Sequence, residues 1–267
     1  MHVEGTNVLV TGASSGIGAA LAELLAEHGA TVGIAARRGE RLDEVLQRCR
    51  SHAPASRAWV VDLSDLDAAE RLLADAWDTF GHLDVVVNNA ATAKRKHVLD
   101  MEFSEYADVM ALDFLSPVRI SLSALSRMQA RGAGQIVMVS STGGRLGIVH
   151  ESAYCAAKAA MCMWAESAAI DLGEVDSPVR VKLVNPGPID TEIWQQRPGE
   201  LPGMISGPFV PARECAAGIL AAIESDGFEF YVPDDMRTVA EAKAAGVDAF
   251  VAAMTTVAKS VFPPGRP

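Results

Sequence analysis

Cysteine and metal-ligand patterns are scarce in this sequence, and so are long apolar runs. Its four cysteines include no Cys-x-x-Cys pair, and its six histidines show no His-Glu-x-x-His spacing. We therefore expect reduced thiols and no metal site. No uninterrupted apolar stretch approaches the ~18 residues of a membrane span, and the first ten residues are too short and mixed for a signal peptide. We expect no membrane partner and, by elimination, a cytoplasmic location.

Positive charge is also in deficit. The chain has 23 lysines and arginines against 34 acidic residues, a net charge of -11, which repels a phosphate backbone and argues against a nucleic-acid partner. Its 267 residues, 49% hydrophobic and 21% charged, fit one α/β domain over residues 1–267.

Short apolar runs alternate with longer segments of helical periodicity, and this alternation predicts the fold. The strands are expected at residues 7–11, 31–35, 57–61, 83–87, 135–140, 179–184 and 228–232. The helices are expected at residues 16–28, 40–51, 66–80, 103–130, 152–172 and 211–225. Such an order predicts an α/β fold of Rossmann type, a doubly wound seven-stranded parallel sheet with helices on both faces.

A glycine-rich loop, Thr11-Gly12-Ala13-Ser14-Ser15-Gly16-Ile17-Gly18, joins the first predicted strand to the first predicted helix. Gly12 permits a tight turn, and Gly16 and Gly18 allow a pyrophosphate and the helix to approach the backbone closely. The loop therefore predicts a dinucleotide site.

A second motif carries proton-transfer chemistry. Tyr154 and Lys158, four residues apart, share one face of a helix, so that an ammonium can sit beside a phenol and favour its ionised form. Reducing a ketone requires a hydride and a proton for the developing alkoxide. Tyr154 is the candidate acid, or the base in the oxidative direction.

Four segments together resemble the short-chain dehydrogenase/reductase family, over roughly residues 5 to 232. They are the glycine loop, Asn88-Asn89-Ala90-Ala91, Ser141 with Tyr154-x-x-x-Lys158, and Asn185-Pro186-Gly187-Pro188-Ile189-Asp190-Thr191. Ala91 departs from the family's usual glycine. The resemblance implies hydride transfer between a nicotinamide cofactor and a small carbonyl or alcohol, in a homotetramer or homodimer joined through the helices at 103–130 and 152–172.

The resemblance also assigns roles to residues. Lys158 would hold the nicotinamide ribose, and Ser141 would orient the substrate oxygen. The cofactor contacts it implies, beyond Tyr154 and Lys158, are Gly12, Ser14, Ser15, Gly16, Ile17, Gly18, Arg37, Arg38, Asp62, Leu63, Asn89, Ala90, Ala91, Pro186, Gly187, Ile189 and Thr191.

Asp113 stands where the family carries an asparagine that anchors a proton-relaying water. An aspartate accepts the same hydrogen bonds but cannot donate, and its charge would hold Lys158 protonated. We expect Asp113 to preserve activity and alter its pH dependence; the alternative is a plain helix residue without a relay.

The end of the second strand bears on the choice of cofactor. Ala36 occupies the place where an NAD enzyme commonly has an acidic residue, and Arg37 follows it, which favours NADP(H). NAD(H) stays open, because a lone arginine can also stack on adenine.

Loops after the strands supply a mainly apolar set of candidate pocket residues, which indicates a hydrophobic ketone or secondary alcohol. These residues lie at 92–95, at 143–149 and in a flap over 193–210 that includes Ile193, Trp194, Met204, Ile205 and Phe209. The basic run at 94–97 either attracts an anionic substrate tail or forms a solvated loop, the reading we favour.

The C-terminal extension at 234–267 carries an apolar helical stripe formed by Val247, Phe250, Val251, Met254, Val257, Ala258 and Val261. Three arrangements are open: the extension covers the active site of its own chain, covers the active site of a partner subunit, or packs on the rest of the domain without a functional role.

A cofactor-binding sensor without catalysis is the alternative function. The joint presence of Ser141, Tyr154 and Lys158 favours the enzyme.

Overall fold

The seven predicted strands form one parallel sheet in the computed structural model, which describes residues 1–204 and 208–262. The spatial order is β3-β2-β1-β4-β5-β6-β9, so the Rossmann-type prediction is confirmed. The strands are β1 (Asn7–Thr11), β2 (Thr31–Ala36), β3 (Arg57–Val60), β4 (Val85–Asn88), β5 (Gly134–Val139), β6 (Val179–Pro186) and β9 (Glu229–Val232).

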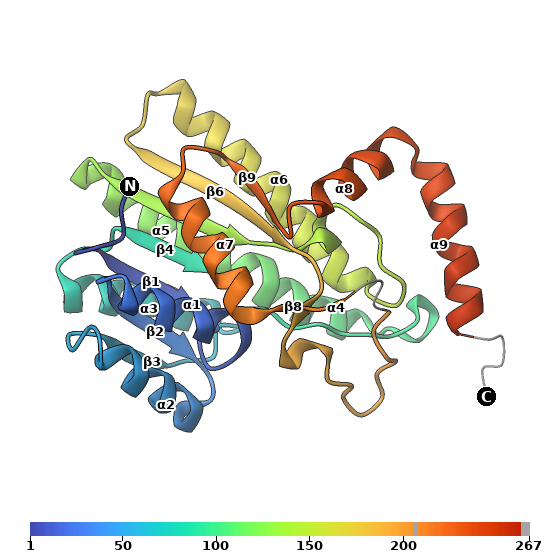
Figure 1. Ribbon diagram of the computed structural model, residues 1–267, viewed down its shortest axis with the longest axis horizontal. Coiled ribbons are helices and arrows are strands. Elements are labelled where there is room, and N and C mark those ends of the chain that lie inside the picture. The colour runs from blue at the N-terminus through green and yellow to red at the C-terminus, as the bar shows by residue number, and fades with distance from the viewer. Residues whose placement is uncertain (205–207, 263–267) are drawn as a thin grey trace.

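Helices cover both faces of the sheet (Figure 1). Alternate side chains of the strands, such as Val10 and Leu9, enter different clusters, since successive residues of a strand point to opposite faces. One cluster is closed by α1 (Gly16–Glu27), α2 (Gly39–Arg50) and α7 (Ala212–Glu224). The other is closed by α3 (Leu66–Phe80), α5 (Ser116–Arg131) and α6 (Ser152–Glu174).

The long helix expected at 103–130 is continuous but irregular. It comprises α4 (Phe103–Met110), a π-helical turn at Ala111–Leu115 and α5. Over Phe103–Arg131 it is long and apolar enough to cross a membrane, and 44% of its most apolar window is buried in the protein. Among described residues, α8 (Met236–Ala245) and α9 (Val247–Val261) pass the same test only as a pair bent by 116°. α5 packs on α3 and β5, and its buried side chains, Ile120, Ala124 and Met128 among them, lie in the core.

One feature of the C-terminal half, a pair of short strands, was not expected from the sequence. The two-residue strands β7 (Ile189–Asp190) and β8 (Val210–Pro211) pair with each other across the flap. The extension folds as α8 (Met236–Ala245) and α9 (Val247–Val261), and α9 stands away from the sheet at the right of Figure 1. Two-residue strands are too short to leave a periodic pattern.

β1 and β4 are parallel neighbours in the middle of the sheet. From β1 the chain adds β2 and β3 on one side, and from β4 it adds the later strands on the other side. Loops that leave the carboxyl ends of these strands diverge to opposite sides, and the crevice between them is where open α/β sheets bind ligands. The glycine loop after β1 and residues 89–91 after β4 therefore meet at this edge.

Candidate active site

The glycine loop owes its shape to contacts within the protein. Gly12 has φ +69°, and a Cβ there would lie 2.7 Å from the Ala90 Cα atom. A Cβ on Gly18 would lie 2.5 Å from the Asn89 side-chain nitrogen. These glycines thus allow the loop, α1 and the end of β4 to pack together.

The first turn of α1 presents backbone N–H groups to the site. Its N-cap, Ser15, makes no side-chain capping hydrogen bond, and the first turn holds no acidic residue. Ser15, Gly16 and Ile17 line the cavity described below. Uncapped amides at the positive end of a helix dipole form an anion site.

Thr11 joins the ends of β1 and β4. Its hydroxyl accepts hydrogen bonds from the backbone nitrogens of Asn89 (2.9 Å) and Ala90 (3.1 Å). The Asn89 side chain donates to the Thr11 carbonyl at 2.9 Å. These bonds hold residues 89–91 beside the glycine loop.

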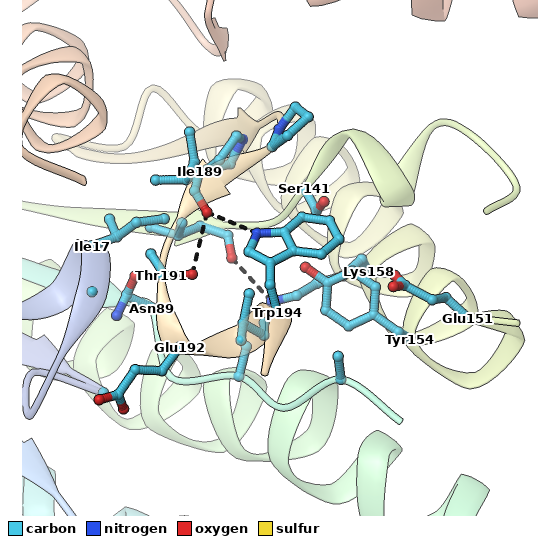
Figure 2. Close-up of a pocket in the computed structure, with 18 of the residues that line it drawn as sticks. Ile17, Asn89, Ser141, Glu151, Tyr154, Lys158, Ile189, Thr191, Glu192 and Trp194 are labelled. Carbon is cyan, nitrogen blue, oxygen red and sulfur yellow. Dashed lines mark hydrogen bonds between the residues drawn. The ribbon is translucent and has the colours of Figure 1, made fainter. Parts of the chain in front are cut away.

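Ser141, Tyr154 and Lys158 come together at the other end of the site (Figure 2). Ser141 follows β5, and its hydroxyl accepts from the Gly143 backbone nitrogen at 3.0 Å. Tyr154 and Lys158 lie on α6, with the Lys158 ammonium 5.7 Å from the centre of the Tyr154 ring. Lys158 Nζ also donates to the Val139 carbonyl at 3.2 Å. All three side chains line one cavity.

The protein groups do not lower the pKa of Tyr154, contrary to the expectation from the Tyr-Lys spacing. Burial raises this pKa, hydrogen bonding with Ser141 opposes the rise, and the Asp113 carboxylate reinforces it. Burial also disfavours the charged form of Lys158 and so lowers its pKa, whereas the Asp113 carboxylate opposes this decrease. The spacing argument missed the desolvation of both groups.

Asp113 is fully buried in the π-helical turn at Ala111–Leu115. Its Oδ1 accepts from the Thr92 backbone nitrogen at 2.9 Å, and its Oδ2, which has no hydrogen-bond partner among the described residues, lies 3.9 Å from Lys158 Nζ. Burial raises the pKa of Asp113 to about 7, and Lys158 opposes this rise. The carboxyl group is therefore placed to change charge near neutral pH beside Lys158.

Two arginines follow β2 at the opposite end of the site, beyond Ala36. Arg37 Nη1 lies 3.7 Å from the Asp62 carboxylate, on the exposed surface. Arg38 donates to the hydroxyls of Ser14 (3.2 and 3.1 Å) and Ser15 (2.6 Å). Arg38 is thus the arginine that contacts the glycine loop.

A single cavity of about 670 Å³ connects the arginines with Tyr154. Most residues expected to contact a cofactor line it, from Gly12 to Thr191. Gly18, Asp62 and Asp113 are not among the lining residues. Asp62 instead accepts from the backbone and hydroxyl of Ser64 (3.0 and 2.8 Å).

Arg95 is buried, which corrects the favoured reading of the basic run as a solvated loop. Its Nε donates to the Glu151 carboxylate at 2.7 Å, and both side chains are 2% exposed. Its Nη1 donates to the Ile193 carbonyl at 2.8 Å, and the guanidinium lies 5.0 Å from the Trp194 ring centre. Arg95 therefore anchors the start of the flap.

The neighbouring lysines are engaged at the surface. Lys94 and Lys96 lie 3.0 and 2.6 Å from Glu105. Hydrogen bonds from Lys96, the Glu102 backbone nitrogen and Lys94 lower the pKa of Glu105 to about 2.

Some expected pocket residues line the cavity and others do not. Trp194 and Met204 line it, whereas Phe209 packs edge-on against Trp194 at 5.5 Å. Ile205 lies outside the described residues, as does the end of the extension at 263–267. Glu151, Glu192 and Met236 also line the cavity, and the sequence analysis did not name them. Only Glu151 could have been suspected, because it lies three residues before Tyr154 in the sequence.

Within the C-terminal stripe, Phe250 and Met254 line the cavity. Other members of the stripe are exposed, with Val251 at 56% and Val261 at 51%. The extension thus presents part of its apolar face to the site of its own chain and part to the surface.

The described residues fit a nicotinamide dinucleotide. The uncapped amides of α1 suit a pyrophosphate, Ala36 leaves room at the end of β2, and Val61 and Leu63 supply apolar surface beside the arginines. At the other end, a phenol, a hydroxyl and an ammonium converge. No group of three metal-ligating side chains occurs within residues 1–204 and 208–262. This combination defines a dinucleotide-dependent oxidoreductase.

Comparison with known proteins identifies the family. A short chain dehydrogenase profile matches residues 6–201. The chain is 36% identical over 231 residues to the cis-4-hydroxycyclohexanecarboxylate dehydrogenase of Sinomonas cyclohexanicum, covering 84% of this chain and 91% of that protein. The chain belongs to the short-chain dehydrogenase/reductase family and is an NAD(P)-dependent oxidoreductase acting on CH–OH and C=O groups.

Solved structures share the fold. A short-chain dehydrogenase/reductase from Burkholderia phymatum in complex with NAD superposes with a TM-score of 0.85 at 20% identity, over 93% of this chain and 96% of that one. A short chain dehydrogenase from Burkholderia cenocepacia J2315 in complex with NADP gives a TM-score of 0.79 at 27% identity, over 95% and 99%.

Proposed function

We propose that this protein interconverts a ketone and a secondary alcohol with NADP(H) as the preferred cofactor. The observation that carries the proposal is one cavity with Ser141, Tyr154 and Lys158 at one end and Arg38 at the other. Arg38 contacts both serines of the glycine loop. Ala36 stands where NAD enzymes commonly have an acidic residue, whose carboxylate would repel a 2′-phosphate. The solved neighbours include one complex with NAD and one with NADP, so the preference rests on Arg38 and Ala36 alone.

In this proposal the chain supplies the proton and the orientation of the substrate. The bound nicotinamide supplies the hydride to the carbonyl carbon. Tyr154 donates its phenolic proton to the carbonyl oxygen as the alcohol forms, and Ser141 hydrogen-bonds that oxygen. Burial raises the pKa of Tyr154, and the Lys158 ammonium, 5.7 Å from the centre of its ring, is the positive charge placed to stabilise the resulting phenolate.

The substrate end indicates a mostly apolar substrate. Leu146, Ile148, Trp194 and Met204 supply apolar surface. Arg95 also lines the cavity, but its charge is already balanced by Glu151.

The test compares the native protein with Tyr154→Phe. We expect native turnover of NADPH with ketones, with a higher kcat/KM than with NADH, and at least about a hundredfold loss in the variant. Binding of NADPH to both proteins, followed by fluorescence, is the control. Equal kcat/KM values for the two cofactors would contradict the NADP preference, and full activity of the variant would contradict the role of Tyr154.

We also propose that the protein forms a homodimer or homotetramer through α4, α5 and α6. Apolar side chains on these helices are exposed in the single chain: Phe103 is 86% exposed, Leu122 56% and Ile170 66%. Light scattering coupled to size exclusion tests this, and a monomer at micromolar concentration would contradict it.

A further inference from the structure

Glu192 closes an ionic link across the mouth of the cavity. It follows Thr191 and begins the short 3-10 turn Glu192–Trp194. Its Oε2 lies 2.6 Å from Arg38 Nη1, and its Oε1 accepts from Arg41 on α2. In Figure 2 this carboxylate points away from Tyr154 and Lys158. The two ends of the link are 154 residues apart in the sequence.

The carboxylate occupies an anion site built by the protein. Two guanidinium groups surround it, and Arg38 is itself oriented by Ser14 and Ser15 of the glycine loop. Guanidinium groups bind carboxylates and phosphates through the same planar donor geometry. The groups that would receive a 2′-phosphate therefore already hold a carboxylate from the same chain.

The link is suited to exchange. The side chains of Arg38 and Arg41 are 46% and 48% exposed, and that of Glu192 is 35% exposed. Ion pairs open to solvent to this degree contribute little net stability, so an anion of higher charge can replace the carboxylate. A 2′-phosphate carries more charge than a carboxylate and three acceptor oxygens.

The turn that carries Glu192 also carries a residue of the substrate end. Trp194 donates to the Ile189 carbonyl at 2.8 Å (Figure 2). The same ring lies 5.0 Å from the Arg95 guanidinium and lines the cavity. A movement of Glu192 away from the arginines would act on Trp194, two residues further along.

We propose that Glu192 is an internal competitor for the 2′-phosphate of NADP(H). Phosphate binding displaces the carboxylate from Arg38 and Arg41, and this release shifts the turn that positions Trp194 beside the substrate. The inference rests on the part of the proposed function in which Arg38 receives the 2′-phosphate. It makes Glu192 a residue that sets cofactor specificity and couples the two ends of the cavity.

The experiment uses two fragments, 2′,5′-ADP and 5′-AMP, which differ by the 2′-phosphate. Each is titrated by calorimetry into the full chain, into Glu192→Gln and into the control Glu44→Gln. Glu44 is exposed on α2, one turn beyond Arg41, so its loss changes the net charge equally. We expect Glu192→Gln to bind 2′,5′-ADP about fivefold more tightly than the native chain, about 1 kcal/mol. Binding of 5′-AMP, and both affinities of the control, should stay unchanged.

Coupling is read from tryptophan emission excited at 295 nm, where the fragments do not absorb. We expect 2′,5′-ADP, and not 5′-AMP, to change the emission of the native chain, and Trp194→Phe to abolish that change.

The outcomes separate this inference from the proposed function. If the native chain and Glu192→Gln prefer 2′,5′-ADP over 5′-AMP by the same factor, the competitor role is wrong and the NADP preference stands. If neither protein discriminates between the fragments, both are wrong. If only Glu192→Gln discriminates, the competitor role is supported and the native preference for NADP is wrong. A change of emission that persists in Trp194→Phe would overturn the coupling.

Discussion

At the scale of single residues, charge and burial compete around Tyr154. The sequence places an ammonium four positions from the phenol, but both groups are buried, and burial disfavours the charged form of each. Asp113, where the family carries asparagine, adds a carboxyl group 3.9 Å from Lys158. The pH dependence of the reaction therefore depends on three coupled groups.

The variant Asp113→Asn is expected to shift the pH profile of alcohol oxidation. The ionised Asp113 raises the pKa of Tyr154, so its removal should lower the apparent pKa of the base and move the limb on which activity rises with pH to lower pH. The native profile should also show an inflection near the pKa of Asp113, about 7, that the variant lacks. Asparagine can still accept the Thr92 hydrogen bond, which controls for geometry. Superimposable profiles of kcat/KM would contradict this role.

The buried pair of Arg95 and Glu151 gives a second residue-scale prediction. Glu151→Gln should lower the free energy of unfolding by roughly 3–5 kcal/mol, because it leaves the Arg95 guanidinium buried without a counter-ion. The double variant Arg95→Met with Glu151→Met removes both charges and should recover much of that loss. Chemical denaturation of both variants measures the difference. A double variant less stable than Glu151→Gln would argue that Arg95 acts mainly through Ile193 and Trp194.

At the scale of elements, the strand and helix order was confirmed because it depends on local patterns. Buried parallel strands read as short β-branched runs, and glycines mark the turn between β1 and α1. The bounds differ by a few residues at strand ends: β4 begins at Val85 rather than at residue 83, and β6 continues to Pro186. Hydrogen bonding to neighbouring strands decides such ends.

Gly18→Ala tests the close contact between α1 and the end of β4. An added Cβ would lie 2.5 Å from Asn89 Nδ2 and from the Gly12 carbonyl oxygen, so we expect a loss of about 1–3 kcal/mol in stability and weaker cofactor binding. Gly173→Ala on α6 is the matched control, since no atom lies within 4 Å of its added Cβ. Gly173→Ala should raise the free energy of unfolding by about 0.5–1 kcal/mol, because alanine is favoured over glycine within a helix. Thermal unfolding with and without NADPH measures both; equal effects would contradict the contact.

At the scale of the whole molecule, the C-terminal extension leaves the sheet and returns to the cavity. Met236 and Val239 of α8 and Phe250 and Met254 of α9 line the cavity, so the last part of the chain contributes apolar surface to a site formed mostly by residues before 205. The other apolar side chains of α9 face outward.

Deleting residues 240–267 tests whether this extension acts as a lid. We expect the substrate KM to rise about tenfold and the affinity for NADPH to change little, because α9 lies on the opposite side of the molecule from α2, which begins just after Arg38 (Figure 1). Circular dichroism and light scattering check that the truncated chain folds and assembles. An unchanged KM would remove the lid role.

The sequence by itself determined the sheet, the glycine loop and the Ser141, Tyr154 and Lys158 set, because each depends on spacing within one short segment or on the order of segments. Tertiary structure alone decided which charges meet. Arg95 pairs with Glu151, 56 residues away, and Arg38 with Glu192, 154 residues away. No local pattern encodes such pairs, since burial and the packing of distant loops bring the side chains together. The same packing raises the pKa of Tyr154, which the sequence spacing had indicated would fall.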